Sequence, residues 1–229
     1  MKRYVLQADK ELVEEIFEVQ SNSKSLFEPN YNVIPGNTMP VVVNMGDSRE
    51  IISSGWGLNQ DGKKGTLHEL PHEEILKDED LKKLAQNSPC IIPTSGFYKW
   101  KETVADPLPF YLRVISQEVT GFAGICTVYK NKAGQEIHSY AVLTMHANAL
   151  VEPLDDTMPV ILNPKDYGRW LSGNALKMIE EGFSGNHLLP DMSVYRVPEL
   201  VNDPSNNSKE LIQPIPKLRN YDGEDEDED

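Results

Sequence analysis

The stretch Gly96-Phe97-Tyr98-Lys99-Trp100 places three aromatic residues and one lysine within the length of a single strand. Two interpretations are open. Aromatic rings beside a cation suit the stacking of bases, as in proteins that bind single-stranded nucleic acid. Alternatively, the segment is an alternating strand whose rings pack in a core. Taken alone the stretch favours the core, so the surrounding sequence has to be weighed with it.

Outward from this block, short apolar runs bounded by Gly, Pro or Asn predict strands. They lie at residues 41–45, 50–54, 90–93, 97–100, 110–115, 121–129, 139–145, 158–162 and 194–197. Helices are expected at residues 10–20 with Asp9 as cap, 79–86, 164–171 with Asn163 as cap, and 174–181 closed by Gly182. Without a regular strand–helix–strand rhythm, this order predicts an α+β fold with a largely antiparallel, barrel-like core flanked by short helices.

Charge separates the body of the chain from its end. The 229 residues carry 36 acids against 22 bases, a net charge of −14, and seven of these acids lie in residues 222–229, which leaves −7 for the rest. We expect one domain over residues 1–216 and a disordered acidic tail over 217–229. An acidic body opposes strong non-specific binding to nucleic acid. A sharper alternative is that the tail mimics a phosphate backbone and binds a basic partner protein.

The cysteines and the N-terminus suggest the compartment. Cys90 and Cys126 both lie in apolar runs, which predicts buried, reduced thiols rather than a disulfide or a metal pair. No apolar stretch of signal length follows the basic N-terminal residues, and no run has the length of a membrane span. We therefore expect cytoplasmic residence and no membrane partner.

One short motif suggests a metal. His68-Glu69-Leu70-Pro71-His72 has the letters of the H-E-x-x-H zinc signature, which works only on a helix, where both histidines face one way. Pro71 opposes that helix because its ring clashes with the preceding turn and pushes the residue before it out of helical geometry. We predict no metal site here and no cofactor.

Several other segments, taken in order, carry a resemblance. They are Asn32-Val33-Ile34-Pro35-Gly36, Trp56-Gly57-Leu58, Pro89-Cys90-Ile91-Ile92-Pro93, Gly96-Phe97-Tyr98-Lys99-Trp100, Phe122-Ala123-Gly124-Ile125, Leu143-Thr144 with Ala147-Asn148, Asp156-Thr157-Met158-Pro159-Val160-Ile161-Leu162, Val201-Asn202-Asp203 and Glu210-Leu211-Ile212-Gln213-Pro214. Any one piece is weak. The ordered set, over about residues 30–216, resembles the SRAP family, the SOS response-associated peptidases.

The resemblance implies a compact α+β fold that recognises abasic sites in single-stranded DNA. In active members, removal of the initiator Met exposes a Cys whose amine and thiol capture the sugar aldehyde as a thiazolidine, which is a DNA–protein crosslink. The same Cys serves self-cleavage of the N-terminus. An Asn in Asn-Ala-Arg, the Glu of Gly-Phe-Tyr-Glu-Trp and the His of His-Asp-Arg-Met-Pro assist capture.

This chain departs from the family at each of those places. Lys2 stands at the position of the Cys, Lys99 at that of the Glu, Asp155 at that of the His and Thr157 at that of the Arg. The Asn-Ala-Arg segment maps near Leu67 to Leu70 without a match. Nucleophile, acid, imidazole and guanidinium are all absent from these positions. We expect a catalytically degenerate member that cannot form the thiazolidine, so we lean against enzymatic activity.

Three hypotheses follow. The first is weak binding of single-stranded or abasic DNA, with Trp56, Phe97, Tyr98, Lys99 and Trp100 as the candidate contacts. The second is a regulatory protein that binds a basic partner through its acidic surface and tail. The third is imine chemistry at Lys2 or Lys99, which requires a lysine pKa lowered by burial or by a neighbouring cation. Against the third stands the interpretation that Lys99 and Asp155 form an ion pair that closes the old cleft.

Overall fold

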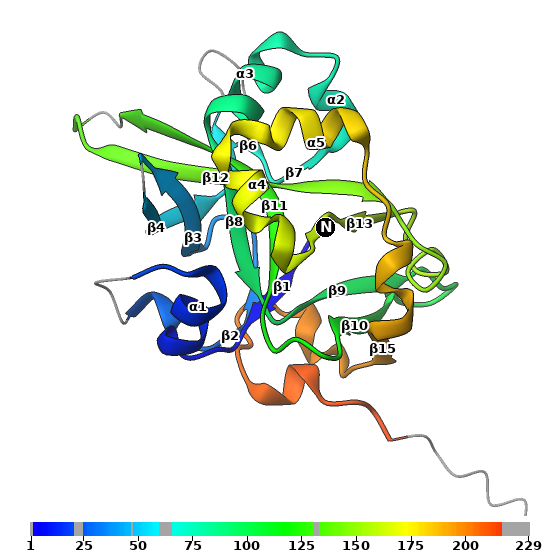
Figure 1. Cartoon of the computed structure of the whole chain (residues 1–229). Helices are drawn as coiled ribbons and strands as arrows, with labels where there is room; N and C mark the ends of the chain where they lie inside the picture. Colours follow the sequence, from blue (N-terminus) through cyan, green and yellow to red (C-terminus); the bar gives the residue numbers. More distant parts are fainter. Residues whose placement is uncertain (1, 21–24, 47, 60–65, 131–132, 217–229) are drawn as a thin grey trace, which may run out of the picture.

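The computed structural model describes residues 2–20, 25–46, 48–59, 66–130 and 133–216 (Figure 1). The prediction of one domain over residues 1–216 stays a prediction. The acidic tail over residues 217–229 lies outside the described residues, and the predictions of its disorder and of a basic partner stay predictions. None of the helices in the described ranges is long and apolar enough to cross a membrane.

The core of the molecule is a closed five-stranded barrel. Its strands pair in the order β3, β4, β12, β11, β8 and back to β3, and within this ring only the β4–β12 pairing is parallel (Figure 1). The strands are β3 (Thr38–Met45), β4 (Ser48–Trp56), β8 (Pro89–Thr94), β11 (Thr120–Lys130) and β12 (Glu136–His146). The predicted α+β class and barrel-like core are confirmed.

Three short strands extend the barrel. They are β7 (Glu69–Pro71), which runs parallel to β12, β13 (Thr157–Pro159), which pairs with β12, and β14 (Ile161–Leu162), which pairs with β11. The predicted single strand over 158–162 is thus two strands. Val160 lies between them and connects both neighbours: its N–H donates to Leu143 O on β12, and its C=O accepts from Ala123 N on β11, each at 2.9 Å.

A second sheet lies beside the barrel and carries the opening segment of the sequence. Its strand order is β15, β10, β9, β1, β2, and every pairing in it is antiparallel. The bounds are β1 (Tyr4–Leu6), β2 (Asn30–Val33), β9 (Gly96–Lys101), β10 (Leu108–Val114) and β15 (Met192–Arg196). A small ribbon of β5 (Leu58–Asn59) and β6 (Thr66–Leu67) completes the strands.

Short helices surround the two sheets (Figure 1). The α-helices are α1 (Lys10–Phe17), α2 (His72–Ile75), α3 (Glu79–Asn87), α4 (Tyr167–Arg169) and α5 (Ala175–Glu181). The 3-10 segments are η1 (Ser25–Phe27), η2 (Pro164–Asp166), η4 (Asn186–Asp191), η5 (Glu199–Asn202) and η6 (Lys209–Ile212), and η3 (Trp170–Asn174) is a π-type turn.

The expected helices are present, with two corrections. The helix predicted over 10–20 ends at Phe17, because Glu18 takes a left-handed conformation at φ 54°. Asp9 lies at the N-cap position but makes no side-chain capping hydrogen bond. The predicted helix over 164–171 starts as 3-10 and becomes α-helical only at Tyr167, although Asn163 does cap it by accepting a hydrogen bond from Lys165 N at 3.2 Å.

The retained motifs hold distant segments of the fold together. The buried amide of Asn32 donates to the carbonyls of Asp203 and Asn206, at 3.1 and 3.0 Å, so two of the family-like segments contact each other. At Gly96 a Cβ would lie 2.4 Å from the Tyr111 hydroxyl and 2.6 Å from Leu112 O, which leaves room only for glycine. These motifs therefore specify the fold, whatever the site does.

A lysine–aspartate pocket as candidate functional site

Strand β9 separates two apolar regions and places its lysine on the barrel side. Phe97 belongs to the main core, whereas Tyr98 belongs to a smaller core with Tyr111, and side chains alternate between the two faces of a strand. Lys99 therefore lies on the same face as Phe97. Its side chain is only 2% exposed, which is rare for a lysine unless it is paired.

The partner of Lys99 is Asp155. Lys99 Nζ lies 2.9 Å from Asp155 Oδ2 and 3.4 Å from Thr157 Oγ1. Asp155 Oδ1 also accepts hydrogen bonds from Thr157 N and Thr157 Oγ1, both at 2.9 Å. The Lys99–Asp155 ion pair predicted from the two substitutions is confirmed. Thr157, where the resemblance places an Arg, contacts both partners.

The two members of the pair are solvated differently. Burial is the largest influence on the pKa of Lys99 and lowers it; the hydrogen bond and charge of Asp155 raise it, the charge of Lys2 lowers it, and the net result is a lowered pKa. Asp155 is 42% exposed. Partial burial acts to raise its pKa, but the hydrogen bonds from Lys99 and from the Thr157 backbone N–H hold that pKa below its ordinary value. The pKa of Lys99 is thus shifted against its charged form, whereas the pKa of Asp155 is shifted in favour of its charged form.

The pair lines a pocket of about 420 Å³. Its lining includes three cationic residues, Lys2, Lys99 and Lys101, and four acidic residues, Glu102, Glu152, Asp155 and Asp156, with Trp100 among the others. This balance gives no positive field for a phosphate backbone. The pocket is better suited to a small polar group than to a run of phosphates.

The first residues of the chain are held beside this pocket. Arg3 donates to Asn32 Oδ1 at 3.0 Å and to the carbonyls of Val201 and Asn202, and its guanidinium lies 5.7 Å from the centre of the Trp100 ring. Trp100 Nε1 in turn donates to Asn202 Oδ1 at 2.7 Å. These contacts fix the start of β1, and they explain why Lys2 reaches the pocket.

The aromatic residues proposed for DNA contact fall into two groups. Trp56 and Phe97 are 1% exposed and Tyr98 is fully buried, so their ring faces are covered by protein. Trp56 packs edge-on against Tyr4 at 5.2 Å. These three side chains pack the interior and present no ring face to a base in this conformation. Trp100 is partly exposed and lines the pocket, so it remains, with Lys99, the candidate contact.

The H-E-x-x-H segment forms no helix. Glu69–Pro71 is strand β7, and helix α2 begins only at His72, which confirms the effect expected of Pro71. The two histidines have separate neighbours: His68 Nε2 lies 3.1 Å from Thr66 Oγ1, whereas the His72 ring packs edge-on against Phe183 at 5.3 Å.

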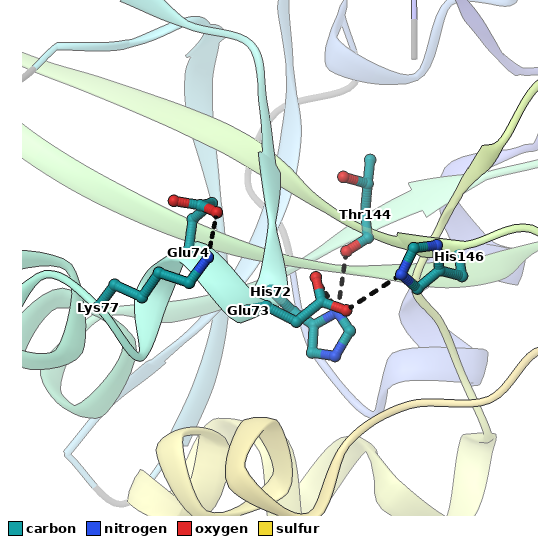
Figure 2. Close-up of polar contacts among 6 residues, drawn as sticks. All are labelled: His72, Glu73, Glu74, Lys77, Thr144 and His146. Carbon is teal, nitrogen blue, oxygen red and sulfur yellow. Dashed lines mark hydrogen bonds and ion pairs between the residues drawn. The ribbon is translucent and has the colours of Figure 1, made fainter.

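A polar cluster lies where α2 meets the end of β12. Figure 2 shows Glu73 between two histidines: its carboxylate lies 3.5 Å from His72 Nδ1 and 3.8 Å from His146 Nε2. His72 Nδ1 also lies 3.1 Å from Thr144 O and must carry a proton to bond that carbonyl. A protonated nitrogen cannot ligate a metal, and the described ranges contain no group of three or more His, Cys, Asp or Glu side chains placed to hold one.

The thiols lie outside the lining of the pocket. Cys90 on β8 and Cys126 on β11 are free and buried in the barrel, as predicted, and neither lines the pocket of Lys99. They are the two cysteines of the chain. Leu67 to Leu70, where the family's Asn-Ala-Arg was placed, are likewise absent from the pocket lining.

Comparison with known proteins agrees with this geometry. Residues 2–204 match the SRAP family, described as SOS response associated peptidase, and the chain belongs to that family. It is 31% identical over 199 residues to the abasic site processing protein YoqW of Bacillus subtilis, covering 82% of this chain and 87% of the relative. The abasic site processing protein HMCES of Xenopus tropicalis is 22% identical, over 82% of this chain and 67% of the relative.

Solved structures show the same fold. A protein from Bacteroides thetaiotaomicron matches with a TM-score of 0.78 at 18% identity, covering 94% of this chain and all of that structure. A Bordetella bronchiseptica protein matches with a TM-score of 0.72 at 20% identity, covering 86% of this chain and all of that structure. The recognition of the family from the sequence segments is confirmed.

Sequence reasoning found Lys2, Lys99, Asp155 and Thr157, which the structure brings together. It missed the roles of Arg3, Asn202 and Glu152, which hold or line the same region. Arg3 directly follows Lys2, Glu152 lies three residues before Asp155, and Asn202 belongs to one of the segments that carry the resemblance. The sequence marked these positions but not their contacts, which depend on the tertiary structure.

Proposed function

We propose that this SRAP protein associates weakly with abasic sites in single-stranded DNA and has lost the thiazolidine chemistry that the family resemblance implies. The main observation in support is the 2.9 Å contact between Lys99 and Asp155. The resemblance places a glutamate and a histidine at these two positions. A buried cation occupies the place of an acid, and a carboxylate the place of an imidazole. Neither can supply the original proton transfer in the same way.

The N-terminus supports the same proposal. A thiazolidine closes only when one residue offers both an amine and a thiol to the same aldehyde carbon. Lys2 has no sulfur, and both cysteines lie in the barrel, outside the lining of the pocket. Replacing the thiol therefore removes the second bond of the ring, whatever the amine does.

The DNA part of the proposal rests on the relatives and on Trp100. YoqW and HMCES are both named abasic site processing proteins. In this chain Trp100, partly exposed at the pocket and braced by Arg3 and Asn202, offers one ring for a base. The four acids in the pocket lining repel phosphates, so we expect weak binding. The contacts that remain are made by the lysines of the pocket, and these weaken as salt is raised.

The test is incubation of the protein with a single-stranded oligonucleotide that carries one abasic site. We expect no covalent species that survives denaturing electrophoresis in the absence of a reductant, and a mobility shift at low salt that disappears as salt is raised. A crosslink formed without reductant contradicts the loss of thiazolidine chemistry. The absence of any shift at low salt contradicts the DNA association.

A restored variant gives the matched control. The triple change Lys2→Cys, Lys99→Glu and Asp155→His returns the three family residues to the pocket. If the pocket geometry is otherwise intact, this variant gains a crosslink without reductant while the parent protein does not. If the initiator Met stays on this variant, its Cys amine is blocked, so removal of Met1 is verified by mass before the assay.

A further inference from the structure

We propose that Lys99 forms a reversible imine with the ring-opened aldehyde of an abasic deoxyribose that enters the pocket lined by Lys2, Trp100 and Asp155. The proposed function supplies only the identity of the aldehyde. The capacity of Lys99 to form the imine is argued from its surroundings and is tested without DNA.

The first argument is the environment of the amine. A lysine becomes a nucleophile near neutral pH when it is desolvated or lies close to another cation. Lys99 meets both conditions: its side chain is 2% exposed, and the charge of Lys2 acts on it across the same pocket. Burial and Lys2 lower the pKa of Lys99 and its ion pair with Asp155 raises it; the net pKa is lowered, which raises the fraction of free amine at a given pH.

The second argument is access. Lys99 is buried among protein atoms, yet it lines a pocket of about 420 Å³, which is larger than a five-carbon sugar needs. Lys2 and Trp100 line the same space. A small aldehyde in this pocket therefore lies beside the Lys99 side chain and its partner Asp155.

The third argument is the proton path. The free amine of Lys99 attacks the aldehyde carbon, and one N–H proton passes through Asp155 Oδ2, at 2.9 Å, to the aldehyde oxygen to give the carbinolamine. The second N–H proton follows the same way to the carbinolamine hydroxyl, which leaves as water as the C=N bond forms. Amine and aldehyde give imine and one water, with no oxidant or reductant consumed, and hydrolysis reverses the step. Thr157 Oγ1, which bonds Asp155 at 2.9 Å, holds the carboxylate in place.

The experiment uses the full chain with 2-deoxyribose 5-phosphate, whose open form carries the same aldehyde, and sodium cyanoborohydride, which reduces the imine to a stable amine. Intact mass measures the adduct and peptide mapping locates it. We expect the first adduct at Lys99, at a yield at least tenfold above the average surface lysine. An adduct spread evenly over the lysines, one placed first at Lys2, or none at all, overturns the proposal.

Matched variants separate chemistry from folding. Lys99→Arg keeps the charge and the contact with Asp155 but has no imine-forming amine, and it should lose the fast adduct. Lys99→Met serves if the larger Arg disturbs the fold. Lys83→Arg, at a surface lysine that is 71% exposed, should leave the adduct unchanged. If Lys99→Arg and Lys99→Met are labelled as fast as the parent, Lys99 is not the nucleophile.

The rate as a function of pH gives an independent readout. The adduct at Lys99 should reach half its maximal rate at a lower pH than the adduct at Lys83 of the same sample. Equal midpoints contradict the proposal. Failure here leaves the DNA association untouched, because that is measured by the mobility shift, and loss of the shift with the adduct intact removes the DNA association alone.

Discussion

The aromatic cluster around Trp56 and the pocket around Lys99 meet at the paired strands β1 and β9, yet they place opposite demands on sequence. Tyr4 on β1 pairs in register with Phe97 on β9, two residues before Lys99. In the cluster, Tyr4 and Tyr140 share a hydrogen bond of 2.7 Å, and Trp56 stacks on Tyr140 at 6.5 Å. In the pocket, a buried cation depends on a half-exposed carboxylate. The cluster requires particular shapes, whereas the pocket requires only that its charges balance.

This difference explains how the fold and the chemistry of a family separate. A core side chain is replaced only at the cost of a cavity, because interiors are close-packed. A charged pair that lines a pocket can be replaced by another charged pair, because water and neighbouring polar groups can solvate the new side chains. The predictions below test this contrast in order of decreasing effect.

The largest effect is expected at Trp56. Trp56→Ala should lower the free energy of unfolding by about 3–5 kcal/mol, the usual cost of truncating a buried tryptophan, and it also leaves His68 O without its 2.7 Å donor. Urea denaturation followed by circular dichroism measures the loss. Trp100→Ala is the matched control, because Trp100 is partly exposed and should cost only about 1 kcal/mol. Equal losses of unfolding free energy in the two variants would contradict the proposed difference between core and pocket.

The second effect concerns the two members of the ion pair. Asp155→Asn should cost about 2 kcal/mol at neutral pH, because it leaves the Lys99 cation buried without its counter-charge. This is less than for a fully buried pair, since Asp155 is 42% exposed and water can approach. Lys99→Met should change stability by less than about 1 kcal/mol, because an apolar chain fills the same space and Asp155 keeps its bonds to Thr157.

Differential scanning calorimetry at pH 7 compares these two variants directly. The contrast is informative because both remove the same ion pair. If Lys99→Met is as destabilising as Asp155→Asn, the pair itself stabilises the fold, and the pocket is not free to exchange its charges.

Much of this architecture could be predicted from the sequence. The longer strands follow from apolar runs between turn residues, and the pairing of Lys99 with Asp155 follows from two substitutions at positions that converge in one family. The strands β1, β5, β6 and β7 could not be predicted, because each is two or three residues long and exists only through its partner strand. Strand pairing between residues that are far apart in the chain leaves no local pattern in the sequence.

The role of the aromatic block was the harder prediction. Alternation along β9 indicates two faces, but only the structure shows that the second face is also covered. Tyr98 donates to Tyr31 O at 2.8 Å and packs in a cluster with Val201 and Leu211, residues that follow it by a hundred positions or more. The stretch taken alone favours the core, and the family resemblance makes Tyr98 a candidate DNA contact, although the C-terminal segments bury its ring.

The third effect is the pH dependence of the pair. The pKa of Asp155 is lower in the folded protein than its ordinary value of about 3.9. Asp155 therefore contributes stability that is complete above that ordinary value and is lost as the pH falls through the lower, folded pKa. The difference in stability between the parent protein and Asp155→Asn should be constant from pH 7 to about pH 5 and should shrink below about pH 4.

Denaturation curves of the two proteins at matched pH and ionic strength measure this difference, in which the titration of groups that do not interact with Asp155 cancels. The interacting Lys99 changes its titration in Asp155→Asn, but below about pH 5 it is a cation in both proteins. If the stability difference between the two proteins stays constant down to pH 2, the effect of Asp155→Asn comes from geometry rather than from charge.

The smallest effect is expected at the acidic edge of the pocket. Glu152 is exposed and lines the pocket beside Asp155, so Glu152→Lys should leave the unfolding midpoint unchanged within about 0.5 kcal/mol. The same change replaces a charge that repels phosphates with one that attracts them. It should raise affinity for single-stranded DNA about three- to tenfold at low salt and steepen its salt dependence. Glu11→Lys, on helix α1 and outside the pocket lining, is the control for net charge. If both variants gain affinity equally, DNA binding is weakened by the net negative charge of the whole domain and not by the acidic residues of the pocket.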